Sequence, residues 1–297
     1  MNTGRVFPKL RWFTALNCRS AISRAGSGLS ELMRVGFYQF APKPRALEEN
    51  LNRIFARLKG VNADLIVLPE LCLSGYLFAS REELARYALK LPDAPVCSRL
   101  ANFCAEKNFS LVLGAAEKAG ASIFNSALLF TPNGSIHVYR KVHLFNDEKD
   151  IFDPGDLPFP VFRVDTVTVG MLVCFDYFFP ESARSLVLRG AQIVCHPANL
   201  VLNYAQSMTI TRAQENRVFW ILANRTGTEA LGSRVMNFTG QSQIISPEGT
   251  VLARASAEDE KLEIVDINPA LALNKTVTPR NDLIADRRPG LYFSGAG

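Results

Sequence analysis

The hydrophobic positions of the chain change their period along its length, and each period predicts an element. Apolar residues dominate positions 34–41, which predicts a buried strand. From residue 47 to 58 they recur every three or four positions, which predicts an amphipathic helix. A second apolar run at 64–68 stops at Pro69 and predicts another strand. A strand–helix–strand unit of this length favours parallel pairing through a right-handed crossover.

The rest of the chain continues this alternation of strand and helix patterns. Further helices are predicted at residues 81–89, 94–107, 180–189 and 207–219, and further strands at 110–116, 124–131, 135–142, 169–173, 191–195, 220–223, 241–245, 251–253 and 262–267. Pro132-Asn133-Gly134 has the composition of a hairpin turn. Residues 34–297 contain no linker, short repeat or low-complexity block. They therefore predict one mixed α/β domain with outer helices and a C-terminal tail from about residue 271.

The composition is that of an ordinary globular chain, with 48% hydrophobic and 21% charged residues among 297. No apolar run approaches the roughly 20 residues that a membrane span requires. The six cysteines are scattered and form no CxxC pair, which argues against a disulfide scaffold and against a structural zinc site. We therefore expect reduced thiols, a cytoplasmic location and no membrane partner.

The net charge of +5 is concentrated at one end of the chain. Residues 1–33 hold five basic residues and one acid, so they carry +4 and the rest of the chain carries +1. A near-neutral folded part argues against a nucleic-acid surface. Residues 1–33 show no lasting period, and we interpret them as a disordered or non-domain extension. Their acid-poor, Arg- and Ser-containing composition is shared with mitochondrial transit peptides, so organelle targeting is the alternative.

One stretch combines a buried strand with a reactive side chain. The strand pattern at 169–173 ends in Cys174, and Pro180 then opens the next predicted helix. Cys174 is therefore predicted at the carboxyl end of a core strand, where open α/β sheets place their chemistry. A thiol beside exposed backbone N–H groups can act as a nucleophile with an oxyanion site. The alternative is a buried cysteine that packs as a small hydrophobe.

Four predicted strands end in a reactive side chain, namely Glu70, Glu117, Lys141 and Cys174. Each alone is weak, because a Glu or Lys at a strand end is commonly a solvated surface residue. Together they supply the groups that an acyl transfer requires. Glu70 would take the thiol proton and later activate water, Lys141 would favour the thiolate and stabilise negative charge, and Glu117 would hold the Lys141 ammonium. The three histidines are poorly spaced for a His-paired thiol or a metal cluster.

These residues stand in motifs that resemble the nitrilase superfamily of carbon–nitrogen hydrolases. The motifs are, in chain order, Pro69-Glu70, Tyr139 to Phe145, Cys174-Phe175-Asp176, Phe179 to Arg184, His196 to Leu200, Glu215-Asn216-Arg217, Asn224-Arg225 and Gly240 to Gly249. The resemblance covers about residues 34–270. The stretch from 174 to 199 is especially similar to thermophilic archaeal nitrilase-like enzymes that act on small aliphatic substrates.

The resemblance implies a four-layer α-β-β-α sandwich that dimerises into an eight-layer assembly. It implies Glu70 as the base, Lys141 as the electrostatic stabiliser and Cys174 as the nucleophile. It places the family's additional glutamate at Glu117 and an oxyanion donor at the backbone N–H of Phe175. No metal or organic cofactor is expected. A homodimer is expected, with a higher homo-oligomer as the alternative, and the dimer is expected to bury the helix that follows Cys174 together with the C-terminal tail.

The resemblance leaves the substrate open between a small aliphatic amide and a nitrile. Dedicated nitrilases tend to carry Cys-Trp-Glu where this chain has Cys-Phe-Asp, which looks more like the amidase and carbamoylase branches, although archaeal relatives with nitrile activity are also similar. An N-carbamoyl amide hydrolase and a non-catalytic binding or scaffold protein are the alternatives. The candidate substrate-binding residues, chosen because they lie next to the motifs, are Tyr76, Phe145, Phe175, Tyr177, Phe178 and Asn199.

Overall fold

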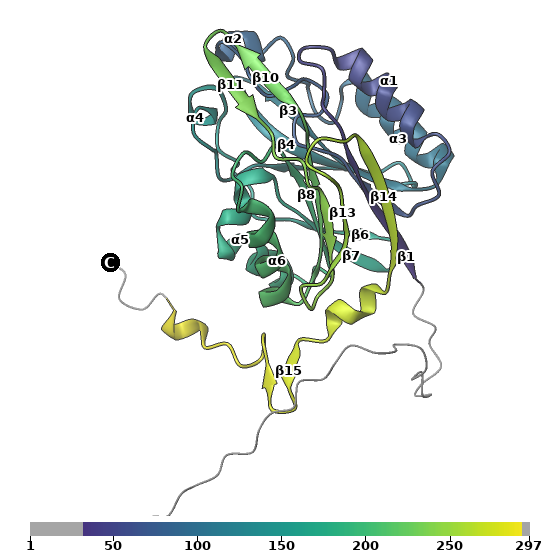
Figure 1. The fold of residues 1–297 in the computed structure, drawn as a ribbon, viewed down its shortest axis with the longest axis vertical. Coiled ribbons are helices and arrows are strands. Elements are labelled where there is room, and N and C mark those ends of the chain that lie inside the picture. Colours follow the sequence, from purple (N-terminus) through teal and green to yellow (C-terminus); the bar gives the residue numbers. More distant parts are fainter. Residues whose placement is uncertain (1–31, 293–297) are drawn as a thin grey trace, which may run out of the picture.

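The structure, a computed structural model, describes residues 32–292 (Figure 1). The predicted extension at residues 1–33 therefore lies outside the described residues, apart from its last two positions. The described chain has a mixed α/β fold with two six-stranded sheets and two two-stranded hairpins. Within residues 32–292, no helix combines the length and the apolar character that crossing a membrane requires.

The first sheet has the strand order β14-β1-β2-β3-β4-β5. Its strands are β1 (Met33–Gln39), β2 (Leu65–Val67), β3 (Ser110–Ala119), β4 (Ser122–Phe130), β5 (Ile136–Arg140) and β14 (Lys261–Ile267). Strands β1, β2 and β3 are parallel, and the outer pairs are antiparallel. Helix α1 (Leu47–Leu58) connects β1 to β2, so the predicted parallel strand–helix–strand unit is confirmed.

The second sheet has the strand order β13-β12-β9-β8-β7-β6. Its strands are β6 (Val161–Val164), β7 (Val167–Met171), β8 (Ile193–Ala198), β9 (Phe219–Asn224), β12 (Gln243–Ile245) and β13 (Val251–Arg254). Strands β7, β8 and β9 are parallel, and they are joined by α5 (Pro180–Leu188) and α6 (Ala205–Asn216). Three strands in each sheet are therefore parallel, so the loops that follow their carboxyl ends lie at the same edge of that sheet.

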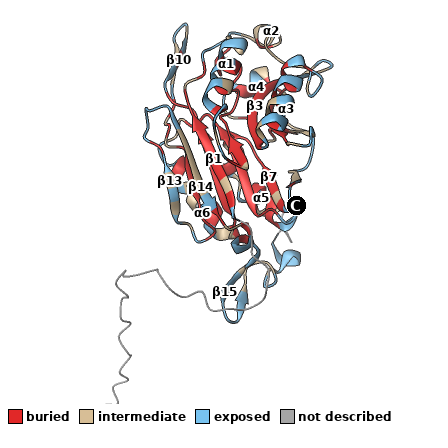
Figure 2. Ribbon diagram, turned by 90° about the vertical axis from the view of Figure 1, so that its right-hand side faces the viewer, coloured by how far each residue is buried: buried red, intermediate tan, exposed pale blue. Residues whose placement is uncertain are grey.

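The two sheets pack against each other and share one hydrophobic core. Val35 and Val112 from the first sheet belong to the same buried cluster as Trp220 from the second. A second cluster joins the first sheet to α1 and α3 (Pro95–Lys107). Helices α5 and α6 contact β7 and β9 of the second sheet. Figure 2 shows the resulting pattern, with buried strands in the interior and exposure concentrated on helices and loops.

Several short elements were not predicted, because two to five residues carry no sustained hydrophobic period. They are α4 (Glu148–Ile151), β6, β10 (Thr228–Leu231), β11 (Arg234–Asn237), β15 (Thr276–Thr278), β16 (Asn281–Asp282) and the 3₁₀ turns Cys174–Phe178, Pro269–Leu273 and Pro289–Leu291. The β15–β16 hairpin lies apart from the two large sheets in Figure 1.

Two predicted boundaries are wrong for a shared reason. The helix predicted at 81–89 is only α2 (Arg81–Leu84), because Leu89 instead forms a strand-like bridge with Glu117. Strand β3 likewise continues to Ala119, where it still pairs with β4. Glu117 therefore lies inside a strand and not at its end. Tertiary pairing overrides the local pattern at both places.

Candidate active site

Glu70 follows β2 and is fully buried. Its Oε1 accepts hydrogen bonds from Asn125 Nδ2 at 2.6 Å and from Lys141 Nζ at 2.8 Å. Its Oε2 has no hydrogen-bond partner among the described residues. Strand β3 approaches so closely that a Cβ at Gly114 would lie 2.4 Å from Glu70 Cα, so glycine is required there. The carboxylate is thus fixed through one oxygen and keeps the other free to accept a proton.

Lys141 directly follows β5, and its side chain is completely buried. Its ammonium donates to Glu70 Oε1 at 2.8 Å and to both oxygens of Glu148, at 2.8 and 2.7 Å. Burial lowers the pKa of Lys141, but the carboxylates of Glu148 and Glu70 raise it by more, so its pKa lies well above the ordinary value. The side chain therefore stays positively charged and can stabilise negative charge that forms beside it.

Glu148 was not predicted as a site residue from the sequence. It opens α4 and is buried, and its carboxylate accepts from Phe145 N at 2.9 Å and from the Tyr76 hydroxyl at 2.9 Å. Burial raises the pKa of Glu148, while the Lys141 ammonium lowers it. In the sequence it stands within a run of charged residues from 147 to 150, which is typical of a solvated surface. Its separation of seven residues from Lys141 was the available signal.

Glu117, the predicted partner of the Lys141 ammonium, lies elsewhere. Its carboxylate accepts from Arg140 Nη2 at 2.7 Å and from Ser126 Oγ at 2.6 Å. Successive side chains of a strand point to opposite faces, so Arg140 and Lys141 diverge at the end of β5. The prediction that Glu117 holds Lys141 is therefore wrong. Glu148 holds the ammonium, and Glu117 pairs with the neighbouring guanidinium.

Cys174 opens the 3₁₀ turn after β7 and is 5% exposed. Its φ of +42° is a left-handed conformation, which costs a non-glycine residue of order 1 kcal/mol. The buried carboxylate of Asp176 closes the turn by accepting from the backbone N–H just before the cysteine at 2.9 Å. It also accepts from the Tyr139 hydroxyl at 2.7 Å and from His143 N at 3.1 Å. Because Tyr139 and His143 flank Lys141, Asp176 links the cysteine turn to the segment that carries the lysine.

His196 supports the backbone of Cys174 from β8. Its Nε2 lies 3.0 Å from the carbonyl oxygen of Cys174, and Trp220 Nε1 donates to its Nδ1 at 3.1 Å. A carbonyl can only accept, so the ring carries its proton on Nε2. Burial lowers the pKa of His196 to about 3, so the ring is neutral near pH 7. With both nitrogens engaged, His196 is not free to act as a base for the thiol.

The thiol of Cys174 interacts electrostatically with all three charged groups of the site. Burial raises its pKa, Glu70 raises it further, and Lys141 and the backbone N–H of Asn199 lower it. The net pKa lies well above that of an ordinary thiol. Lys141 therefore lowers the pKa of the Cys174 thiol, as expected, but burial and Glu70 together raise it by more. A thiol in this setting keeps its proton at rest and would require a base at the moment of attack, which is the role expected of Glu70.

Two small cavities lie beside these groups. The cavity at Cys174 measures about 10 Å³ and is lined by Phe145, Phe175, Tyr177, Asn199 and residues 200–202. Its neighbour measures about 30 Å³, and its lining includes Tyr76, Phe145 and Glu148.

Five of the six predicted substrate-binding residues therefore line one of these cavities. The exception is Phe178, which lines neither; it is 38% exposed, and its ring packs against Phe175 at 5.3 Å. The Asn199 side-chain amide and the Tyr177 hydroxyl are buried, and neither finds a hydrogen-bond partner within residues 32–292. Both groups are therefore available to a water or to a ligand.

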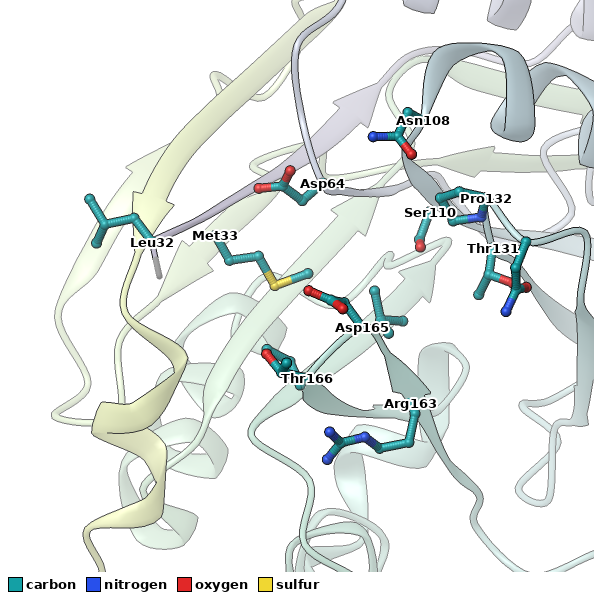
Figure 3. A pocket seen from close by; sticks show the side chains of 13 residues that line it. Leu32, Met33, Asp64, Asn108, Ser110, Thr131, Pro132, Arg163, Asp165 and Thr166 are labelled. Carbon is teal, nitrogen blue, oxygen red and sulfur yellow. The ribbon is translucent and has the colours of Figure 1, made fainter. Parts of the chain in front are cut away.

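A larger cavity of about 410 Å³ lies at the other end of the strands (Figure 3). Its lining includes Asp64 just before β2, Ser110 at the start of β3, and Arg163 and Asp165 at the β6–β7 turn. None of the predicted site residues lines it. A further cavity of about 400 Å³ is lined by Phe175, the residue after Cys174, together with His143 and Phe179, so the candidate site also borders a large cavity.

Known proteins are similar to this chain over most of its length. The family model "Carbon-nitrogen hydrolase" matches residues 34–273. The chain is 40% identical to a nitrilase of Pyrococcus abyssi over 88% of this chain and 100% of that protein. It is 32% identical to an (R)-stereoselective amidase of a Pseudomonas species over 89% of this chain and 93% of that protein. A crystal structure of an amidase from Nesterenkonia superposes with a TM-score of 0.72 at 28% identity, covering 90% of this chain and 98% of the amidase.

Proposed function

We propose that this chain, which belongs to the carbon–nitrogen hydrolase family, cleaves a small aliphatic amide or nitrile with Cys174 as the nucleophile. As a member of this family it is a hydrolase that acts on carbon–nitrogen bonds other than peptide bonds. One observation carries this proposal. The buried ammonium of Lys141 bridges Glu70 and Glu148, and all three groups interact with the Cys174 thiol. Four reactive groups from three separate segments of the chain thus meet in one buried site.

The first half of the proposed reaction acylates the cysteine. As Cys174 sulfur attacks the amide carbon, the thiol proton passes to Glu70 and a sulfur–carbon bond forms. The negative charge that develops on the substrate oxygen is stabilised by Lys141 and by the backbone N–H of Phe175. The carbon–nitrogen bond then breaks, the nitrogen takes the proton from Glu70, and ammonia leaves a thioester on Cys174.

The second half releases the acid. Water attacks the thioester carbon, gives one proton to Glu70, and the sulfur departs and recovers that proton. For a nitrile, the first attack gives a thioimidate, and a water must add before ammonia departs. The same three groups serve both routes, so the substrate is decided by what the cavity admits.

The cavity favours a small and largely uncharged acyl group. Apart from Asn199, its lining beside Cys174 is dominated by aromatic and aliphatic side chains, such as Phe145 and Leu200. A charged substituent buried there would lose its hydration without gaining an ionic partner. The buried and unpaired Asn199 side-chain amide would instead pair with a neutral polar group of the substrate.

A substrate panel tests the proposal directly. Ammonia release is measured from short amides, the matching nitriles and N-carbamoyl amides, with Cys174→Ala as the inactive control and Cys72→Ala as a matched buried-cysteine control. We expect release from at least one small aliphatic amide or nitrile, lost in the first variant and kept in the second. Release that persists in Cys174→Ala would refute the nucleophile, preference for the N-carbamoyl compounds would shift the substrate class, and no release from any compound would favour a binding or scaffold role.

The proposed architecture is a four-layer α-β-β-α sandwich in which residues 34–297 form the hydrolase domain, with a C-terminal tail from about residue 271. Two copies pair through α5 and this tail. Large exposed apolar side chains on these segments support the pairing, namely Leu188, Leu271, Leu273, Val277 and Tyr292. Light scattering tests it. We expect a mass of twice 32.8 kDa that falls toward the monomer in a Leu273→Asp/Val277→Asp variant, whereas a monomeric wild-type chain would contradict the dimer.

A further inference from the structure

A buried ion pair lies outside the groups assigned to the reaction. Arg225, just after β9, and Glu229 in β10 are 1% and 2% exposed, and Arg225 Nη1 donates to Glu229 Oε2 at 2.6 Å. The guanidinium also lies over the ring of Phe238 at 4.0 Å. A buried pair of this kind costs desolvation, so it is weak evidence for stability alone. The remaining contacts of the Glu229 carboxylate indicate a second role.

Glu229 is joined to the loop that follows Glu70. Its carboxylate accepts from Tyr76 N at 3.0 Å and from Leu77 N at 2.8 Å, so two backbone donors of that loop end on one side chain. The loop bends around it, since a Cβ at Gly75, where φ is +84°, would lie 3.1 Å from Glu229 Oε1. No neutral side chain of the same length would satisfy both N–H groups and the guanidinium together.

Tyr76 carries this connection into the active site. Its backbone is held by Glu229, its ring contacts Phe238 edge-on at 5.8 Å, and its hydroxyl donates to Glu148 Oε1 at 2.9 Å. The same Glu148 oxygen accepts from Lys141 Nζ at 2.8 Å. The contacts therefore run without a gap from Arg225 to the buried ammonium.

We infer that Glu229 is a positioning residue for the hydrolytic site, which acts by fixing Tyr76 so that the Tyr76 hydroxyl orients Glu148 against Lys141. The inference rests on the proposed role of Lys141 in catalysis. Glu229 itself touches neither Cys174 nor Lys141 in any recorded contact, so its effect on turnover passes through Tyr76.

The charge around Glu148 gives this role a measurable sign. The titratable groups that face Glu148 are Lys141, Glu70, Tyr76 and, through the shared site, Cys174. A hydrogen bond donated by Tyr76 favours the ionised form of Glu148, so losing it raises the pKa of Glu148. Losing the negative charge of Glu229 by its field alone would lower that pKa. Loss of the hydrogen bond would therefore move the acid limb of the pH profile of kcat to higher pH, whereas loss of the Glu229 charge alone would move it to lower pH.

The test is a double-mutant cycle in the full-length chain, using an amide or nitrile that the wild type hydrolyses. Tyr76→Phe and Glu229→Gln are each expected to lower kcat about tenfold with KM changed less than threefold, and to move the acid limb to higher pH. The double variant should lose less than about threefold beyond either single variant, because both changes break one connection.

Glu83→Gln is the matched control. Glu83 also pairs with an arginine, Arg45, at 2.6 Å, and also accepts from a backbone N–H of the same loop, that of Ala79, at 2.5 Å, but it has no recorded contact with Glu148. It should change kcat less than twofold. A multiplicative double variant, an acid limb that moves to lower pH in Glu229→Gln, or equal losses in Glu83→Gln would overturn the inference. Failure of the wild type to hydrolyse any compound would refute the proposed function instead, so the two failures are distinct.

Discussion

The two ends of the parallel strands differ in a way that locates the chemistry. At the carboxyl ends, Glu70, Lys141 and Cys174 converge beside two small cavities of about 10 and 30 Å³, and a third cavity of about 400 Å³ is lined by the adjacent Phe175. At the amino ends, Asp64 and Asp165 border an opening of about 410 Å³. None of the buried groups that converge at the carboxyl ends lines this opening. Cavities of about 410 and 400 Å³ border the amino and the carboxyl ends, so the convergence of buried charge, and not volume, identifies the site.

The packing at the carboxyl ends explains why buried charges are tolerated there. Lys141 is fully buried, yet its ammonium has a carboxylate on each side and every recorded contact is shorter than 3 Å. Removing one member of such a set leaves the others uncompensated in a low dielectric, which costs about 3–5 kcal/mol. The amino-end groups are partly exposed and can be screened by water. Substitutions at the two ends should therefore differ sharply in effect.

The largest difference is expected for Lys141→Met, which keeps the length of the side chain and removes its charge. Loss of the ammonium should lower kcat at least about 10³-fold, because it removes charge stabilisation from a buried site. It should also reduce the free energy of unfolding by about 3 kcal/mol, because Glu70 and Glu148 then face each other uncompensated. Steady-state kinetics and denaturant unfolding measure the two effects.

The control for this change is Lys149→Met, on the exposed side of α4. It should alter kcat less than twofold and stability by less than about 0.5 kcal/mol. If Lys141→Met kept more than a tenth of the wild-type kcat, a stabilising role for the ammonium would be excluded.

The hydrophobic pattern of the sequence predicts which residues of this site follow the end of a strand. Glu70 and Cys174 follow buried apolar runs, and Lys141 follows a hairpin arm, so their placement at strand ends could be predicted from periodicity alone. Their convergence could not be predicted in this way, because it depends on how the two sheets pack. The resemblance to a known family supplied that expectation.

Glu148 and Glu117 show where local patterns fail. Glu148 is buried only because the loop after Lys141 folds back, with Phe145 N donating to the Glu148 carboxylate. A charged run in sequence does not reveal such a reversal. In the sequence Glu117 follows an apolar run, but β3 pairs with β4 for two residues beyond it, and the Glu117 side chain pairs with Arg140. The reversal of a loop therefore decided the placement of Glu148, and cross-strand pairing decided that of Glu117.

A second prediction concerns the thiol and is smaller. Because Glu70 raises the pKa of Cys174, Glu70→Gln should lower that pKa, increase the thiolate fraction at pH 7 and speed alkylation by iodoacetamide about tenfold. The wild-type thiol should react more slowly than a free cysteine, and its rate should still be rising above pH 9. Mass spectrometry of the peptide that contains Cys174 follows the rate. Slower alkylation in Glu70→Gln would contradict the assigned interaction, and unchanged alkylation of Cys195, buried in β8, is the internal control.

The smallest effect is expected at the amino ends, where the same chemical change can be made as at the carboxyl ends. Asp165 is exposed and has a φ of +52°, which asparagine adopts readily, so Asp165→Asn should change kcat, KM and stability within about twofold and 0.5 kcal/mol. Asp176→Asn neutralises a fully buried carboxylate that accepts from Tyr139, His143 and the cysteine turn. It should destabilise the fold by about 1–3 kcal/mol and lower kcat at least tenfold. A tenfold loss of kcat in a stably folded Asp165→Asn enzyme would show that the large cavity takes part in turnover, and the contrast between the two ends would then fail.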